Sequence, residues 1–292
     1  MKLREFFEKE NLIRDVDFLN TYCPFFALEK SIGYIQNENA IEKINKDKNI
    51  VGVITLERFM NKISSSKGIV ISDNPQFSYY CLHNKLVEDN LLPPLHKSFV
   101  SSSSLISSTA IIGNNVFIGE DVRIGNGVII HDNSYISDET VIDDYAIIGA
   151  KGMQDTNIDG ENLNLNYAGG VKIGKNCHIL SQAIIQKPYQ PFYTNIGNNT
   201  KVSVKVVIGH GSQVGSNTLI AGNCQIAGNV RIGNNVWIGP SSTLSDNIII
   251  EDNAKIIIGS VVIENVLSGK SVSGNFAVNH SINLKNFIKL KR

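Results

Sequence analysis

The sequence has few cysteines, and they are widely separated. Among its 292 residues are four cysteines, one tryptophan and seven prolines. Cys23, Cys81, Cys177 and Cys224 show no paired spacing, so the sequence predicts neither a disulfide framework nor a cysteine zinc site. We expect these cysteines to be small buried side chains in a reducing cytoplasm.

An excess of charge is also absent. Lys and Arg together number 27, Asp and Glu number 27, and the formal net charge is +0. A chain with so little net field is not expected to bind nucleic acid or an anionic membrane surface as a whole. No hydrophobic run is long enough to span a bilayer, and residues 1–8 include acids and lack the apolar core of a secretory signal. We therefore predict a cytoplasmic protein with neither membrane insertion nor a nucleic-acid partner.

An aliphatic side chain recurs at every sixth position over more than half of the chain. The first run extends from Ile106 to Ile148, the second from Ile173 to Ile185, and the third from Ile196 to Val262. A helix repeats near 3.6 residues and a strand near 2, so neither element explains a sustained period of six. The period predicts a mainly β hexapeptide β-helix, in which three hexads form one coil of a triangular prism and the marked aliphatics point inward.

The chain divides near residue 95. We predict a small α/β domain at 1–95, a β-helix domain at 96–265 and a capping tail at 266–292. In the first domain, apolar runs predict strands at 50–54 and 68–71, while helical spacing is found at 39–47 and 75–89. Two prolines in Leu91–His96 exclude a helix there and mark the connector.

Two breaks interrupt the period of six. Residues 151–170 are rich in Asn, Asp and Gly and predict a polar loop at one corner of the prism. Residues 187–194 contain two prolines and three aromatic side chains, and a loop of this kind is not expected to stand free in water. Near the C-terminus, residues 286–292 predict a short basic helix that covers the last coil.

The interior of such a prism is filled by its own side chains, so any active site is expected on its outer surface. Such solenoids commonly pack as symmetric trimers, so we predict a homotrimer with pockets between neighbouring prisms. His210 is the best candidate for a reactive group there. It lies two positions after the inward Ile208, between Gly209 and Gly211, and an imidazole can act as a general base near neutral pH. The alternative from the residues alone is a surface histidine at a corner.

The other histidines are weaker candidates. His131 and His178 each adjoin an inward isoleucine, and we expect them to be solvated corner residues. With His210 they would make a set of three, but no close spacing supports a zinc site, so no metal is expected.

The segment from Ile208 to Gly239 resembles the catalytic coils of bacterial hexapeptide acyltransferases that act on nucleotide-activated amino sugars. The sequence is most similar to the UDP-3-O-acylglucosamine N-acyltransferase family of lipid A synthesis. The resemblance covers residues 30–280 and implies a left-handed parallel β-helix with His210 as the catalytic base. Gly33–Asn37 resembles the segment with which that family holds the uracil and ribose, so Tyr34 and Asn37 are implied nucleotide contacts. Residues 69–75 are similar to a neighbouring Asn-Pro turn of the family.

The departures from the family lie in the substrate region. Ile184–Pro188 stands where those enzymes have Thr-Ile-Asp-Arg-Gly, which makes Gln186 a candidate substrate contact. Asn247 occupies the position of their second active-site histidine and is a second candidate substrate contact, and Lys151–Gln154 replaces an Asp-Gly-Phe-Gly segment. The chain also lacks the long C-terminal helices that dock an acyl carrier protein in the family. We therefore expect acetyl-CoA or another acyl-CoA as the donor, with acyl carrier protein as the alternative.

These observations predict acyl transfer to the amino group of a UDP- or dTDP-amino sugar for lipopolysaccharide, O-antigen or another surface glycan. Gly222, Asn223 and Gly228 are candidate contacts of the CoA thioester, since backbone N–H groups can stabilise a developing oxyanion. Four alternatives stay open: the lipid A reaction with acyl carrier protein, O-acetylation of a sugar, a metal-dependent hydratase of the carbonic anhydrase type, and a non-catalytic hexapeptide module.

Overall fold

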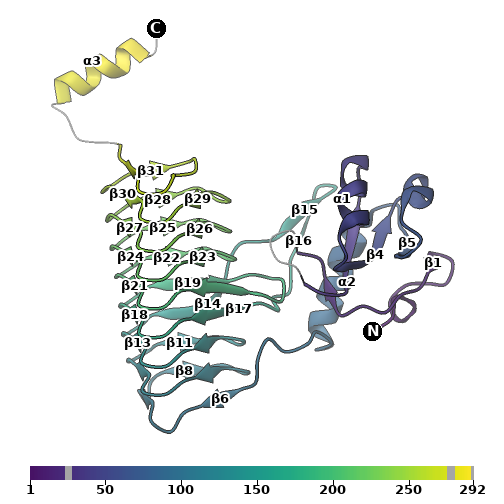
Figure 1. Cartoon of the computed structure of the whole chain (residues 1–292), viewed down its shortest axis with the longest axis horizontal. Coiled ribbons are helices and arrows are strands. Elements are labelled where there is room, and N and C mark those ends of the chain that lie inside the picture. The colour runs from purple at the N-terminus through teal and green to yellow at the C-terminus, as the bar shows by residue number, and fades with distance from the viewer. Residues whose placement is uncertain (24–27, 275–279, 291–292) are drawn as a thin grey trace.

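The computed structural model describes residues 1–23, 28–274 and 280–290, which form a small α/β domain, a tall stack of coils and a C-terminal helix (Figure 1). The α/β domain has one five-stranded sheet in the order β1-β5-β4-β3-β2, antiparallel only between β1 and β5. Its strands are β1 (Leu12–Arg14), β2 (Asn20–Thr21), β3 (Ser31–Ile35), β4 (Ile50–Thr55) and β5 (Gly68–Ile71). Its helices are η1 (Leu3–Glu5), η2 (Glu38–Ala40), α1 (Ile41–Lys46), η3 (Glu57–Lys62) and α2 (Pro75–Glu88).

Helix α2 begins and packs as its sequence dictates. Pro75 occupies the first turn, where a missing N–H is harmless, and the side chain of Asn74 accepts a hydrogen bond from the N–H of Phe77 at 3.0 Å. One face of α2 buries Tyr79, Leu82 and Leu86 against the strand residues Ile32, Ile54 and Val70. The strands and helices that the sequence predicts at 50–54, 68–71, 39–47 and 75–89 are thus confirmed, with shifts of one or two residues.

The stack has three flat faces, each a parallel sheet with strands that are mostly two residues long. The first face contains β6 (Phe99–Val100), β9 (Phe117–Ile118), β12 (Tyr135–Ile136), β17 (Gly170–Ile173), β20 (Tyr193–Ile196), β23 (Gln213–Val214), β26 (Arg231–Ile232) and β29 (Ile249–Ile250). The second face contains β7 (Leu105–Ile106), β10 (Arg123–Ile124), β13 (Val141–Ile142), β18 (His178–Ile179), β21 (Lys201–Val202), β24 (Leu219–Ile220), β27 (Trp237–Ile238), β30 (Lys255–Ile256) and β32 (Ser271–Val272). The third face contains β8 (Ile111–Ile112), β11 (Ile129–Ile130), β14 (Ile147–Lys151), β19 (Ile184–Lys187), β22 (Val207–Ile208), β25 (Gln225–Ile226), β28 (Thr243–Leu244) and β31 (Val261–Val262).

The period of six follows from this geometry. Each strand pairs in parallel with the strand one coil away, as Ile208 pairs with Ile226 and Ile226 with Leu244. The second residue of most strands points inward, and these residues form one continuous buried core along the stack. The predicted fold class, a left-handed parallel β-helix with a small N-terminal α/β domain, is confirmed.

The corners of the prism explain the abundance of asparagine. A residue with positive φ recurs every six positions, as at Asn217, Asn223, Asn229 and Asn235, with φ between 55° and 59°. Asparagine tolerates this left-handed conformation better than most residues do. Glycine is needed where coils approach closely, since a Cβ on Gly215 would lie 2.5 Å from backbone atoms of Gly233.

The first break contains regular structure that a loop prediction does not include. Strands β15 (Thr156–Ile158) and β16 (Glu161–Leu163) form an antiparallel hairpin that extends from the stack toward α2. The stack itself begins with β6, before the first predicted hexad at Ile106, and its last strand is β32, beyond residue 265.

Helix α3 (His280–Leu290) follows the last coil, and Figure 1 draws it apart from the stack. The predicted basic helix at 286–292 falls partly on α3, while residues 291 and 292 lie outside the described ranges. That the tail caps the last coil stays a prediction. Among the described residues, no helix combines the length and apolarity that crossing a membrane requires.

Candidate active site

His210 lies where the third face turns into the first face, immediately after β22. Gly211 follows it with a φ of +71° and donates its N–H to the hydroxyl of Thr194 at 2.8 Å. The carbonyl of His210 accepts a hydrogen bond from the N–H of Asn229, one coil further, at 2.8 Å. The backbone that carries the imidazole is therefore anchored on both sides.

The imidazole of His210 is held between two glycines. A Cβ on Gly228 would lie 2.3 Å from Cε1 and 2.5 Å from Nε2 of the ring. A Cβ on Gly152, in the segment after β14, would lie 2.9 Å from Cδ2 of the ring. Because neither position has room for a side chain, these glycines define the space in which the ring sits. The sequence assigned Gly228 to the thioester, whereas the structure shows first of all that it accommodates the ring.

The surroundings of His210 favour its neutral form. Burial lowers the pKa of His210 below its usual value, and the carboxylate of Asp246 opposes this effect in part. The Nδ1 atom is buried and has no hydrogen-bond partner among the described residues. Unpaired buried polar atoms are costly, so native proteins keep few of them, and one on a candidate base needs an explanation. A neutral imidazole of this kind can accept a proton at neutral pH.

The two other predicted substrate contacts near His210 come from neighbouring coils. Gln186 lies in β19, one coil below β22, and its Oε1 would be 2.8 Å from a Cβ on Gly152, so it shares the surroundings of the ring. Asn247 lies two coils above His210. Its N–H donates to the carbonyl of Gly228 at 3.1 Å, and its side-chain amide donates to Asp246.

The remaining predicted thioester contacts lie elsewhere. Gly222 and Asn223 form the turn that enters the third face, at the opposite end of its strands from His210. The N–H of Asn223 donates to the carbonyl of Val204 of the preceding coil at 3.0 Å. Gly228 is the only one of the three that contacts the His210 ring. A role of Gly222 and Asn223 in binding CoA stays a prediction.

A second feature is a cavity of about 310 Å³ at the junction between the α/β domain and the stack. Tyr34 and Asn37, the two predicted nucleotide contacts, both line it. Side chains that the sequence did not assign to any site also line it: Tyr22, which follows β2, Tyr79 and Tyr80 of α2, and Tyr189 and Gln190 of the second break.

The tyrosines of this cavity pack on one another. The ring centroids of Tyr34 and Tyr79 are 5.1 Å apart, those of Tyr79 and Tyr80 are 5.2 Å apart, and those of Tyr80 and Tyr189 are 6.2 Å apart. Burial raises the pKa of Tyr34 above its usual value, which keeps the hydroxyl protonated. A concave aromatic lining of this kind offers flat faces on which a planar ligand can stack.

Gln190 belongs to the stack but inserts into the cavity wall. It is only 4% exposed, and its amide nitrogen donates to the carbonyl of Tyr22 and to the hydroxyl of Tyr79. A carbonyl can only accept, so these contacts fix the orientation of the amide group. The expectation that the aromatic break would not stand free in water is confirmed by Tyr189 and Gln190.

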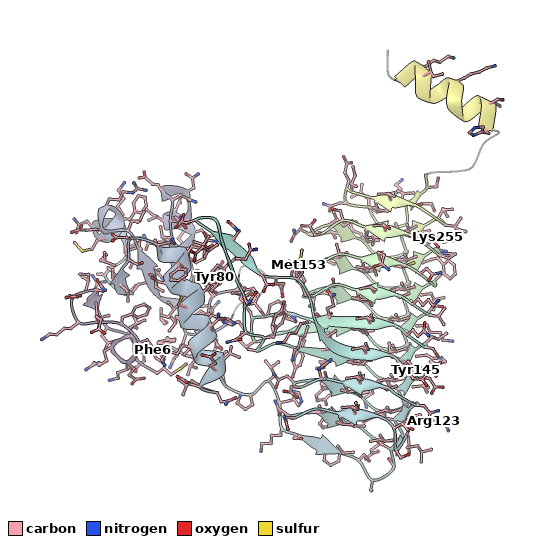
Figure 2. All side chains as sticks on the ribbon, turned by 180° about the vertical axis from the view of Figure 1, so that it is seen from behind. Phe6, Tyr80, Arg123, Tyr145, Met153 and Lys255 are labelled. Atoms are coloured by element: carbon pink, nitrogen blue, oxygen red, sulfur yellow. The ribbon has the colours of Figure 1, made fainter. Side chains whose placement is uncertain are left out.

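Further contacts hold the α/β domain against the two breaks. His83 of α2 donates from Nε2 to the carbonyl of Asn166 at 3.0 Å, and its Nδ1 lies 2.9 Å from the hydroxyl of Thr21. The side chain of Asn84 donates to the carbonyl of Asn164 and accepts from the N–H of Asn166, each at 2.8 Å. Figure 2 shows Tyr80 on α2 and Met153 on the segment that leaves the stack toward this domain.

The other histidines do not converge on His210. His178 lies on the second face, where its Nε2 is 2.9 Å from Oδ2 of Asp143. His131 is on the third face, and burial together with Lys187 lowers its pKa. Among the residues that the structure describes, no group of three or more His, Cys, Asp or Glu side chains could hold a metal ion.

Comparisons with known proteins agree with the repeat pattern. The family model described as bacterial transferase hexapeptide (six repeats) matches residues 104–144, so this part of the chain carries the predicted transferase-type repeats. No curated protein matches the sequence. Among solved structures, the chain is similar to the UDP-N-acetylglucosamine acyltransferase of Francisella novicida, at 24% identity over 65% of this chain and 71% of that one, with a TM-score of 0.49.

Two other solved structures illustrate the range of similarity. The UDP-N-acetylglucosamine O-acyltransferase of Moraxella catarrhalis is 26% identical over 65% of this chain and 76% of that one, with a TM-score of 0.46. A mutant perosamine N-acetyltransferase from Caulobacter crescentus, solved with CoA and GDP-perosamine, is 14% identical over 84% of this chain and 74% of that one, with a TM-score of 0.19.

Proposed function

We propose that the protein transfers an acyl group, in the first instance acetyl, from a CoA thioester to the amino group of a nucleotide-activated amino sugar used for surface glycans. The observation that carries this proposal is the half-buried, neutral imidazole of His210, which is held between Gly152 and Gly228 and whose Nδ1 has no partner among the described residues. General base catalysis needs an imidazole that is neutral near the working pH and within hydrogen-bond reach of the proton that it takes.

In the proposed reaction, His210 takes a proton from the sugar amine as the amine attacks the thioester carbonyl. The C–N bond forms, the tetrahedral oxyanion collapses, and the C–S bond breaks. The proton held by His210 then passes to the departing thiolate, so the imidazole ends the cycle neutral. Our candidate donor to the oxyanion is the N–H of Gly228, the residue whose Cα side faces the ring.

The tyrosine-lined cavity supports the assignment of a nucleotide sugar. Its aromatic walls suit a nucleobase, and the amide of Asn37 can both donate to and accept from the polar edge of a pyrimidine. The cavity and the surroundings of His210 are joined by one short segment, because Gln186 and the ring both lie next to Gly152 while Tyr189 and Gln190 line the cavity. Four residues of extended chain span at most about 14 Å, which is a distance that one nucleotide sugar can bridge.

We also propose that the protein functions as a homotrimer. The outward side of the third face carries an aliphatic residue on five successive coils: Ile111, Ile129, Ile147, Ile184 and Val207. An apolar stripe of this kind is the expected contact surface of a second prism. His210 follows the last of these strands, so a neighbouring subunit packed on the stripe would form one wall of the site.

The proposal is tested by assaying acetyl transfer to a panel of UDP- and dTDP-amino sugars, with acetyl-CoA and acetyl-acyl carrier protein as alternative donors. We expect an amide product that resists hydroxylamine, formed from acetyl-CoA. We expect His210→Ala to lower kcat by about 10² to 10⁴ with the circular dichroism spectrum unchanged. An ester product would contradict transfer to an amino group, and transfer only from the carrier protein would contradict a CoA donor. A His210→Ala variant with most of its activity would contradict His210 as the base.

A further inference from the structure

A column of corner residues runs up the stack at the exit of the third face. Because Ile208, Ile226 and Leu244 are paired in register, the residues two positions after each of them are stacked: His210, Gly228 and Asp246. The N–H of Asn229 donates to the carbonyl of His210, and the N–H of Asn247 donates to the carbonyl of Gly228, which confirms the alignment. The next member of the column is Glu264, two positions after Val262.

Gly228 leaves the space between His210 and Asp246 without a side chain. The His210 ring fills part of this space, since the atoms nearest to a Cβ on Gly228 are Cε1, Nε2 and Nδ1, at 2.3, 2.5 and 3.0 Å. Adjacent coils are separated by about 4.8 Å. The backbones of His210 and Asp246, which are two coils apart, are therefore separated by about 10 Å in the direction of stacking. In this column, His210 and Asp246 are therefore separated by one position, which is a glycine.

The carboxylate of Asp246 has polar neighbours and, within the described part of the chain, no basic partner. Its oxygens accept hydrogen bonds from the hydroxyl of Ser245 at 3.3 Å and from the side-chain amide of Asn247. No ion pair of Asp246 is found among the described residues. Its negative charge is therefore not neutralised locally, and it acts on a cation that forms nearby.

Other charged groups face the site from the segments packed below the ring. Lys151 precedes Gly152, and Lys187 follows Gln186, but both act on His131. Lys187 is 6% exposed and donates to the backbone carbonyl of Asp132 at 3.4 Å. Asp246 is the charge that acts on His210.

We infer that Asp246 is a positioning residue for the base, whose carboxylate stabilises the imidazolium that His210 becomes when it takes the proton. This inference rests on the proposed function. Burial favours the neutral ring in the resting enzyme, and Asp246 limits the cost of charging it during the reaction. Asp246 thus lies two coils above His210, and the residue between them, Gly228, has no side chain.

The first test is a histidine NMR titration of the full-length protein without substrate, with the His210 signal assigned by its loss in His210→Ala. Asp246→Asn should lower the pKa of His210, because it removes the charge that favours the imidazolium. Asp246→Glu should restore most of the wild-type value. Glu264→Gln removes a carboxylate of the same column one coil further away, and we expect little change from it.

The second test is the pH dependence of acetyl transfer. In Asp246→Asn we expect kcat to fall by about an order of magnitude, with KM for the sugar little changed and the acid limb of the profile moved to lower pH. An unchanged His210 pKa in Asp246→Asn, or an equal shift in Glu264→Gln, would overturn the inference even if the wild type acetylates. A shifted His210 pKa in a protein that acylates no sugar would instead overturn the proposed function and leave the charge interaction standing.

Discussion

Replacement of Gly228 by alanine is the most direct test of the geometry around His210. The added Cβ would lie 2.3 Å from Cε1 and 2.5 Å from Nε2 of the imidazole. Carbon atoms make favourable contact at about 3.5 to 4.0 Å, so the ring must move by about 1 Å or more. The backbone itself accepts alanine, since Gly228 is not among the positive-φ glycines.

The expected consequence is a loss of rate rather than a loss of fold. A misplacement of about 1 Å at a reacting group can lower the rate about 10²-fold, which corresponds to roughly 2.7 kcal/mol of transition-state stabilisation. Gly152→Ala should have a smaller effect. Its Cβ would meet Cδ2 of the ring at 2.9 Å and the flexible end of Gln186 at 2.8 Å, and Gln186 can yield.

Steady-state kinetics of acetyl transfer and thermal melting of the wild type, Gly228→Ala and Gly152→Ala would measure these effects. Gly274→Ala is a suitable control, because a Cβ there has no atom within 4 Å. We expect Gly228→Ala to melt within a few degrees of the wild type while its kcat falls. If Gly228→Ala keeps more than about a third of the wild-type kcat, the ring does not need the position in which the structure holds it, and the argument from the two glycines is refuted.

Two further predictions concern the junction between the domains. Tyr34→Ala should weaken binding of a nucleoside diphosphate by roughly 5- to 150-fold, equivalent to a stacking contribution of about 1–3 kcal/mol, whereas Tyr34→Phe should bind normally; calorimetry that finds equal affinity for Tyr34→Ala would remove Tyr34 from the site. Burial lowers the pKa of His83 from 6.5 to about 4, so between these pH values the unfolded chain binds a proton that the folded protein does not. The free energy of unfolding should therefore fall by about 3 kcal/mol on account of His83 as the pH falls from about 6.5 toward 4. Urea unfolding should show a weaker pH dependence of this free energy in His83→Gln than in the wild type.

Much of the fold could be predicted because the β-helix repeats a local rule. An inward aliphatic every six residues, with an asparagine or glycine at most corners, specifies the coil, and the inward aliphatics continue from Ile196 to Val262 without interruption. The pattern could not reveal the hairpin of β15 and β16. Its strands are short and polar, and contacts with α2, such as the hydrogen bond from Asn74 to Asp159 at 2.7 Å, form only after the chain has folded.

The candidate site was predictable in part. His210 is conspicuous because glycines flank it, and Tyr34 and Asn37 followed from a family resemblance. Gly152 was noted only as a departure from the family, and Asp246 was not noted at all. Both are brought to His210 by the stacking of coils, and an exposed aspartate at a corner looks like any other solvated charge in the sequence.

The sequence by itself therefore determined the architecture, since burial of one aliphatic in six is a local requirement repeated along the chain. It also determined which imidazole stands at a glycine-flanked corner. Only the tertiary structure decided which residues surround that imidazole and complete the tyrosine-lined cavity. Residues 18 positions apart become neighbours through the pitch of the coil, and Tyr189 meets Tyr80 through the docking of one domain on the other. Charge and shape at these sites depend on such contacts, which no local pattern encodes.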